Sequence, residues 1–141
     1  LAPIADFLQN ITPMPAVFDR DYVKRIDGVN TRSADSKLQL VNAIREDIKR
    51  FKIENQCDRL VMIWCASTEK FISEAEVHQD IESFLGGLEE NDANISPSMI
   101  YAYASILEGV PFINGAPNLS VDTPVLEKLA REQSVPICVP C

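Results

Sequence analysis

Small and hydroxyl-bearing side chains follow two apolar stretches, each of which has the length of a buried strand. Residues 65–69 (CASTE) come after the run 59–65 (RLVMIWC), and residues 114–118 (NGAPN) come after the apolar segment 110–113. Because the carboxyl ends of parallel strands meet at the same edge of a sheet, we expect both segments to lie there together. Small side chains and hydroxyls at that edge allow a flat or phosphorylated ligand to approach the backbone.

Both segments also have an ordinary structural explanation. Ser67 and Thr68 could cap the helix that follows them, and Asn114-Gly115 is a common turn sequence. The glycine-rich fingerprint of dinucleotide-binding folds and the Walker-type phosphate loop are both absent from the 141 residues. The spacing alone therefore leaves a ligand edge and plain turn chemistry both open.

The cysteines are the residues best suited to metal or redox chemistry. Cys138-Val-Pro-Cys141 has the spacing of a redox or zinc pair, but a thioredoxin-like pair precedes a helix, whereas this pair ends the sequence. A zinc site would also need Cys57 and Cys65, and we expect Cys65 at the end of a buried strand. We interpret the cysteines as small apolar residues and keep a cysteine-dependent metal or redox module as a weaker alternative.

A catalytic acid–base pair is not recognisable either. His78, the only histidine, lies within a predicted helix beside Val77 and has no nucleophile signature around it, so we expect it at the surface. Paired carboxylates such as Glu89 and Glu90 are typical of a solvated helix face, and Trp64 is expected in the core. We therefore predict no catalytic residue and no metal ligand within this chain.

Hydrophobic periodicity indicates the elements that position the two segments. Helices are predicted at residues 35–55, 73–90, 96–108 and after 123, and strands at 59–65, 110–113 and 135–139. The continuous apolar run at 59–65 favours a parallel strand buried on both faces. The order strand, helices, strand, helix, strand indicates βαβ crossovers, a parallel sheet and helices on both faces, which is an α/β fold.

One helix has unusually clear start and stop signals. Ser96 is a good N-cap, and Pro97 suits the first helical position because its missing N–H would be unpaired there anyway. Gly109 can adopt the left-handed conformation that closes a helix, and Pro111 prevents the helix from resuming. We expect residues 1–35 to be an irregular lead-in, with a short helix at 3–9 and a helical turn after Asp19.

Composition limits the classes of partner. The hydrophobic fraction of 46% suffices for a core, and the net charge of −8 disfavours a surface that tracks nucleic-acid phosphates. The sequence has neither an apolar run of membrane-spanning length nor a signal peptide, so we expect a cytoplasmic protein without a membrane partner. A first residue other than Met and an apolar final strand lead us to expect a fragment of a longer polypeptide.

Three stretches resemble one enzyme family, in that family's own order. Residues 59–69 (RLVMIWCASTE) resemble the segment V-L-W-T-A-N-T-E of the inositol-phosphate synthases. Residues 95–104 (ISPSMIYAYA) and 108–115 (EGVPFING) resemble their blocks I-S-P-S-x-x-Y-A and E-G-V-P-F-I-N-G, and residues 12–19 (TPMPAVFD) resemble a stretch that precedes both. The similarity extends to Ile137, so the sequence resembles the myo-inositol-1-phosphate synthase family, also called inositol-3-phosphate synthases.

The resemblance implies an NAD-dependent isomerase that takes part in inositol and phospholipid biosynthesis. That family converts D-glucose 6-phosphate into inositol phosphate by oxidation at C5, enolisation, intramolecular aldol closure and reduction, and it assembles as a homotetramer. The implied fold is a Rossmann-like, NAD-binding domain with a parallel sheet. Residues 1–141 would form the latter part of it, as a single partial domain. They divide into the lead-in at 1–35 and a helix with a βαβαβ core at 36–141. The family's glycine-rich loop lies upstream of Leu1, and its catalytic lysines lie downstream of Ile137.

The family's NAD contacts fall on eight residues of this sequence, all small or apolar: Ala16, Val17, Cys65, Ala66, Ser67, Thr68, Gly115 and Ala116. Ala66 and Thr68 match the family's T-A-N-T loop, whereas Cys65 and Ser67 depart from it. Ala116 replaces a serine and so loses a hydroxyl group. The resemblance therefore implies backbone contacts with NAD more strongly than side-chain hydrogen bonds.

Two hypotheses of different classes follow. In the first, the chain is part of an NAD-dependent isomerase and supplies an NAD-binding edge without the catalytic lysines, so that the isolated piece is inactive. In the second, the chain is a non-catalytic α/β binding or interaction module. Because a partial sheet would expose strand edges and apolar helix faces, we expect a homo-oligomer in either case.

Overall fold

A computed structural model describes residues 11–138 of the chain, so the expected helix at 3–9 and Cys141 lie outside the described residues. The described part contains four α-helices, a short 3₁₀ turn and two small parallel sheets. In chain order these are β1 (Ala16–Val17), β2 (Thr31–Arg32), α2 (Lys37–Glu54), β3 (Met62–Trp64), the 3₁₀ turn Glu76–His78, α3 (Ile81–Glu90), α4 (Pro97–Leu107), β4 (Phe112–Asn114), α5 (Pro124–Glu132) and β5 (Ile137–Cys138).

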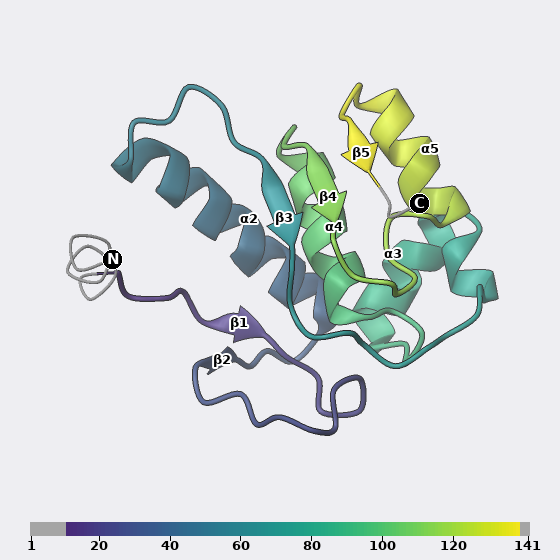
Figure 1. Cartoon of the computed structure of the whole chain (residues 1–141). Helices are drawn as coiled ribbons and strands as arrows, with labels where there is room; N and C mark the ends of the chain where they lie inside the picture. The colour runs from purple at the N-terminus through teal and green to yellow at the C-terminus, as the bar shows by residue number, and fades with distance from the viewer. Residues whose placement is uncertain (1–10, 139–141) are drawn as a thin grey trace.

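The main sheet is parallel, with the strand order β3-β4-β5 (Figure 1). Ile63 is paired with Ile113, which in turn is paired with Cys138. The predicted order of strand, helices, strand, helix, strand is therefore confirmed, and so is the α/β fold class. From β3 to β5, each strand is added on the same side of the one before it. Because crossovers between parallel strands are right-handed, α4 and α5 lie on the same face of the sheet.

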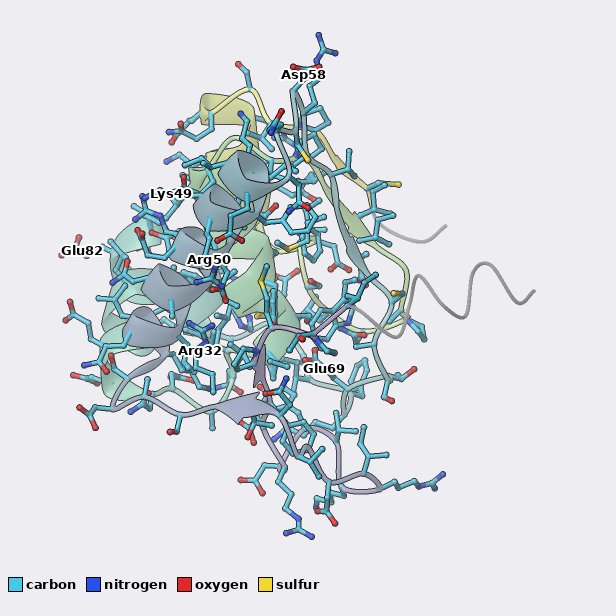
Figure 2. All side chains as sticks on the ribbon, turned by 90° about the vertical axis from the view of Figure 1, so that its left-hand side faces the viewer. Arg32, Lys49, Arg50, Asp58, Glu69 and Glu82 are labelled. Atoms are coloured by element: carbon cyan, nitrogen blue, oxygen red, sulfur yellow. The ribbon has the colours of Figure 1, made fainter. Side chains whose placement is uncertain are left out.

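The described helices gather on that one face, as Figure 2 shows from the side of the sheet. A second helical layer does not occur within residues 11–138, and the prediction that the strand at 59–65 is buried on both faces is wrong. Val61 and Ile63 are 57% and 59% exposed, whereas Met62 between them packs against the core. The strand pairs only with β4 in the described part of the chain, which leaves its other edge open.

Helix α4 lies at the centre of the helical layer and forms as its end signals predict. The hydroxyl oxygen of Ser96 accepts a hydrogen bond from the N–H of Met99 at 3.3 Å, and Pro97 occupies the first turn. Gly109 has φ = 67°, the left-handed conformation that ends a helix. The chain then passes directly into β4, where Phe112 is completely buried.

Two predictions about the segment before α4 are wrong. Helix α3 begins at Ile81 and not near residue 73, because Asp80 caps it by accepting a hydrogen bond from the N–H of Ser83 at 2.9 Å. His78 is fully buried and not at the surface. Its Nδ1 accepts a hydrogen bond from the N–H of Ala75 at 3.0 Å, so its Nε2 donates to the carbonyl oxygen of Asn94 at 2.9 Å.

The lead-in is more ordered than expected. Its two short strands are parallel, with Ala16 opposite Thr31, whereas the sequence predicted irregular chain there. The helical turn expected after Asp19 is present only as a turn, in which the Asp19 carbonyl oxygen accepts hydrogen bonds from the N–H groups of Tyr22 at 3.1 Å and Val23 at 3.2 Å. The N–H of Val17 donates to the hydroxyl oxygen of Tyr101 at 3.0 Å, which joins the lead-in to α4.

Candidate functional site

The loops that follow β3 and β4 meet at the carboxyl edge of the sheet, as predicted. The N–H of Gly115 donates a hydrogen bond to the carbonyl oxygen of Trp64 at 2.8 Å. A Cβ atom at position 115 would lie 2.9 Å from that oxygen, which is closer than such atoms approach. Glycine is therefore required here by the close approach of the two strand ends, and the sequence Asn114-Gly115 does more than form a turn.

A cavity of about 250 Å³ lies between this edge and the lead-in. It brings together four of the eight residues that the sequence singled out: Ala16, Val17, Ala66 and Ser67. The aromatic rings of Trp64 and Tyr101, whose centroids are 5.4 Å apart, also line it. An apolar wall with a few polar groups is typical of small-molecule sites, and it suits the face of a flat ring.

The other four candidate residues lie apart from this cavity. Ala116 is buried and lines a separate recess of about 450 Å³ together with Pro117 and Asn118. Cys65, Thr68 and Gly115 are exposed at the sheet edge. The alternative that Ser67 and Thr68 cap the next helix is wrong, because Ala75 and Asp80 occupy the cap positions of the two helical elements that follow.

A buried glutamate connects the two loops, and sequence reasoning missed its role. Glu69 follows the exposed segment 65–68 and is only 4% exposed. One carboxylate oxygen accepts the N–H of Ser98 at 3.0 Å; the other accepts the Ser98 hydroxyl at 2.6 Å and the side-chain amide of Asn118 at 3.0 Å. Burial raises the pKa of the Glu69 carboxyl, and the hydrogen bonds from Ser98 oppose that shift.

The loop after β4 is also held by its own side chains. The side-chain amide of Asn114 donates to the carbonyl oxygen of Asn118 at 3.0 Å, and its side-chain oxygen accepts the N–H of Ala116 at 3.0 Å. Within the described residues, the side-chain oxygen of Asn118 and the indole N–H of Trp64 are buried without a hydrogen-bond partner. These two buried atoms are therefore able to hydrogen-bond to a ligand at the edge.

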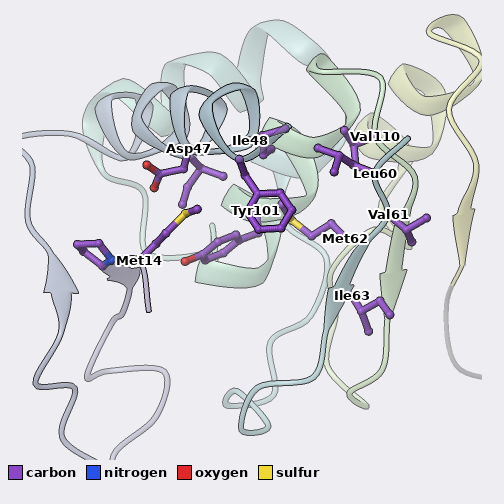
Figure 3. A pocket seen from close by; sticks show the side chains of 12 residues that line it. Met14, Asp47, Ile48, Leu60, Val61, Met62, Ile63, Tyr101 and Val110 are labelled. Atoms are coloured by element: carbon purple, nitrogen blue, oxygen red, sulfur yellow. The ribbon is translucent and has the colours of Figure 1, made fainter. Parts of the chain in front are cut away.

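A second hollow, of about 370 Å³, lies between α2 and β3 (Figure 3). It is lined mainly by apolar side chains, among them Met14, Ile48, Met62 and Ile63. None of the eight candidate residues lines it, and Tyr101 separates it from the smaller cavity because that ring borders both. We place the candidate site at the smaller cavity, because that is where the predicted loop residues converge.

Residues 11–138 contain no group of three His, Cys, Asp or Glu side chains that could hold a metal ion. The cysteine pair at 138 and 141 is only partly within the described range, because Cys141 lies outside it. None of the described helices is long and apolar enough to cross a membrane.

Comparison with known proteins identifies the family. An NAD-binding family model described as Myo-inositol-1-phosphate synthase matches residues 1–139. Inositol-3-phosphate synthase 1 of Bacteroides thetaiotaomicron is 42% identical over 135 residues, which cover 95% of this chain and 32% of that protein. Inositol-3-phosphate synthase of Citrus paradisi is 36% identical over 115 residues, which cover 79% of this chain and 22% of that protein.

A solved structure agrees with these relatives. The crystal structure of inositol-3-phosphate synthase from Caenorhabditis elegans matches 96% of this chain with a TM-score of 0.88 and 29% identity, over 27% of its own length. The chain therefore spans about a third or less of the length of the relatives that it matches. The extent of the model match and the level of identity show that the chain belongs to the NAD-binding myo-inositol-1-phosphate synthase family.

Proposed function

We propose that this chain supplies part of the NAD-binding edge of an isomerase that converts D-glucose 6-phosphate into myo-inositol phosphate. The observation on which the proposal chiefly rests is the contact between Gly115 and Trp64, which joins the two strand ends beside a cavity lined by small residues. Family membership supports the reaction, because the relatives are named inositol-3-phosphate synthases. The names of the relatives do not support the contrasting hypothesis, a non-catalytic interaction module.

The residues of the edge fit NAD. Ala16, Val17, Ala66 and Ser67 leave room for a flat ring, and the exposed backbone at residues 65–68 and 115 can hydrogen-bond to the ligand. We assign NAD contacts to these residues and to Ala116, which gives the eight positions that the family resemblance implies. When bound, NAD accepts and returns a hydride, so that the net reaction is an isomerisation.

We assign neither a catalytic residue nor a metal ligand to this chain. The described residues that line the cavity include neither Lys nor Arg, so groups elsewhere in the protein would neutralise the phosphates of NAD and of the substrate. We further propose that residues 1–141 form one partial NAD-binding domain of a cytoplasmic homo-oligomer, a tetramer as in the family. The apolar side chains that β3 leaves exposed support burial against further structure.

The test is a turnover assay on the full-length polypeptide that contains these residues. The protein is incubated with NAD and glucose 6-phosphate, and phosphorus NMR follows the appearance of inositol phosphate. We expect product that depends on added NAD, with no net formation of NADH. Absence of product with NAD still bound would indicate a dinucleotide-binding relative with other chemistry, and absence of both would favour the interaction module.

A further inference from the structure

The buried carboxylate of Glu69 lies immediately after an exposed loop. Residues 65–68 are exposed, whereas Glu69 is 4% exposed and points into the fold in Figure 2; Glu82, labelled in the same view, points away from it. Burying a carboxylate is costly in free energy unless hydrogen-bond donors replace the lost water. The donors that surround Glu69 therefore determine where this end of the loop lies.

Two of these donors belong to the amino terminus of α4. Ser98 offers its backbone N–H at 3.0 Å and its hydroxyl at 2.6 Å. The first N–H groups of a helix have no partner within the helix, and the helix dipole favours a negative charge beside them. Ser96 provides the local cap, and its oxygen is 2.9 Å from that of Ser98. Glu69 therefore acts as a second cap, although it is 29 residues from Ser98 along the chain.

The third donor belongs to the loop after β4. The side-chain amide of Asn118 lies 3.0 Å from Glu69 Oε2 and 3.1 Å from Ser98 Oγ. The carbonyl oxygen of Asn118 accepts the side-chain amide of Asn114, whose own oxygen holds the N–H of Ala116. One carboxylate thus links the loop at residues 65–68 to the loop at residues 114–118 through a continuous series of hydrogen bonds.

We propose that Glu69 is a positioning residue that fixes both loops of the NAD-binding edge against the amino terminus of α4. This inference rests on the proposed function, because it takes these loops to contact NAD. Contacts made through the backbone depend on where the loop backbone is held, and a loop that must become ordered on binding lowers affinity. Glu69 also lines the cavity, but its carboxylate oxygens already accept hydrogen bonds from Ser98 and Asn118. Removal of the carboxylate therefore weakens NAD binding through the positions of the two loops.

The experiment compares Glu69→Gln with Glu82→Gln in the full-length protein. Glutamine keeps the size of the side chain but places an amide N–H₂ where an oxygen accepted hydrogen bonds, so one link is lost. Glu82 is an exposed glutamate on α3, and its replacement is the matched control. The readouts are the Kd for NAD by calorimetry, the KM for NAD against kcat, and hydrogen exchange of the two loops.

For Glu69→Gln we expect a Kd and a KM for NAD that are on the order of tenfold higher, a smaller change in kcat, and faster exchange at residues 65–68 and 114–118. Saturating NAD should restore slow exchange in both loops. Asn118→Ala removes the link from the other side. Its effect on the Kd should not add to that of Glu69→Gln, because both changes break the same series of hydrogen bonds.

An unchanged Kd together with unchanged exchange in Glu69→Gln overturns the inference and leaves the proposed function standing. Wild-type protein that binds no NAD overturns the proposed function, and with it the inference. Additive effects of Glu69→Gln and Asn118→Ala would show that the two residues act separately, which also contradicts a single positioning network. If Glu69→Gln does not fold, Asn118→Ala tests the inference instead. We expect the same faster hydrogen exchange in the two loops of that variant.

Discussion

The backbone N–H of Gly115 donates to the carbonyl oxygen of Trp64 across 2.8 Å, and the position that a Cβ atom of residue 115 would occupy lies 2.9 Å from that same oxygen. The hydrogen bond and the steric restriction therefore have one origin, the close approach of the ends of β3 and β4. Any side chain at position 115 must push these strand ends apart, and with them the two loops of the candidate site.

Gly115→Ala should destabilise the protein by about 1–3 kcal/mol, because the added methyl group meets backbone, which cannot move aside as a flexible side chain can. The free energy of unfolding in urea measures the effect. The NAD dissociation constant should rise as well.

The control for this substitution is Gly86→Ala within α3, where nothing lies within 4 Å of the added Cβ atom. That change should stabilise the protein by about 0.5–1 kcal/mol through helix propensity. Equal effects at both glycines would contradict the steric explanation.

Local signals predicted the central part of the fold correctly. Ser96, Pro97 and Gly109 each act through neighbours within a few residues, and α4 begins and ends where they indicate. The parallel pairing of the strands follows from the alternation of strands and helices, which needs no knowledge of tertiary contacts. The start of α3 was missed although its cap, Asp80, is local. Other features that sequence reasoning missed depend on partners that are distant along the chain or lie in another layer.

His78 illustrates the difficulty, because its burial depends on the carbonyl oxygen of Asn94, 16 residues away. Glu69 is a stronger case, since its partner Ser98 is 29 residues away and no local pattern marks the pair. The exposure of Ile63 on β3 could not be predicted either, because an apolar run does not show whether a neighbouring layer covers it. At the candidate site, sequence reasoning located the two loops, but not the network that joins them.

The stability of the protein should depend on pH through Glu69. Burial raises the pKa of its carboxyl in the folded state, so folding favours the protonated form. Protonated Glu69 contributes its full stabilisation to the free energy of unfolding below the unfolded-state pKa of about 4.3. This stabilisation is lost as the pH rises through the raised folded-state pKa. The free energy of unfolding of wild type, relative to Glu69→Gln, should therefore fall as the pH rises from about 4.

Urea unfolding of both proteins at a series of pH values gives this difference. Glu82→Gln, at an exposed position, is the control for the loss of one carboxylate. A difference between wild type and Glu69→Gln that increases with pH would mean that the hydrogen bonds from Ser98 outweigh burial.

Asp47 should be the main electrostatic link between the lead-in and the helical layer. It is 5% exposed, and its two oxygens accept hydrogen bonds from Arg32 on β2 at 2.5 Å and from Arg50 on α2 at 2.6 Å. Asp47→Ala leaves both guanidinium groups without this partner, and we expect a loss of about 2 kcal/mol in the free energy of unfolding.

The neighbouring residue Glu46 provides the matched control for Asp47. Its side chain is 72% exposed and pairs only with Lys49 across 3.1 Å among the described residues, so Glu46→Ala should change stability by less than about 0.5 kcal/mol. Urea unfolding measures both variants. A loss at Glu46 equal to that at Asp47 would contradict the buried ion pair as the cause, because alanine has a higher helix propensity than either acidic residue and propensity alone would not destabilise α2.

The open side of β3 should make the 141-residue chain self-associate. Val61 and Ile63 are more than half exposed, and they border the apolar hollow between α2 and β3 (Figure 3). An exposed apolar strand with an unpaired edge is a template for association, and a charged side chain on it opposes that association. Ile63→Lys should therefore shift the sedimentation coefficient of the chain towards that of a monomer.

Ile53→Lys is the control for the effect of charge alone. Ile53 is 75% exposed near the end of α2 and does not line the hollow, so a lysine there adds the same charge without blocking β3. If association depends on the open strand, Ile53→Lys leaves the sedimentation profile of the wild-type chain unchanged at every concentration. Equal shifts in both variants would indicate general charge repulsion, and a monomeric wild-type chain at high concentration would show that the exposed face of β3 does not drive association.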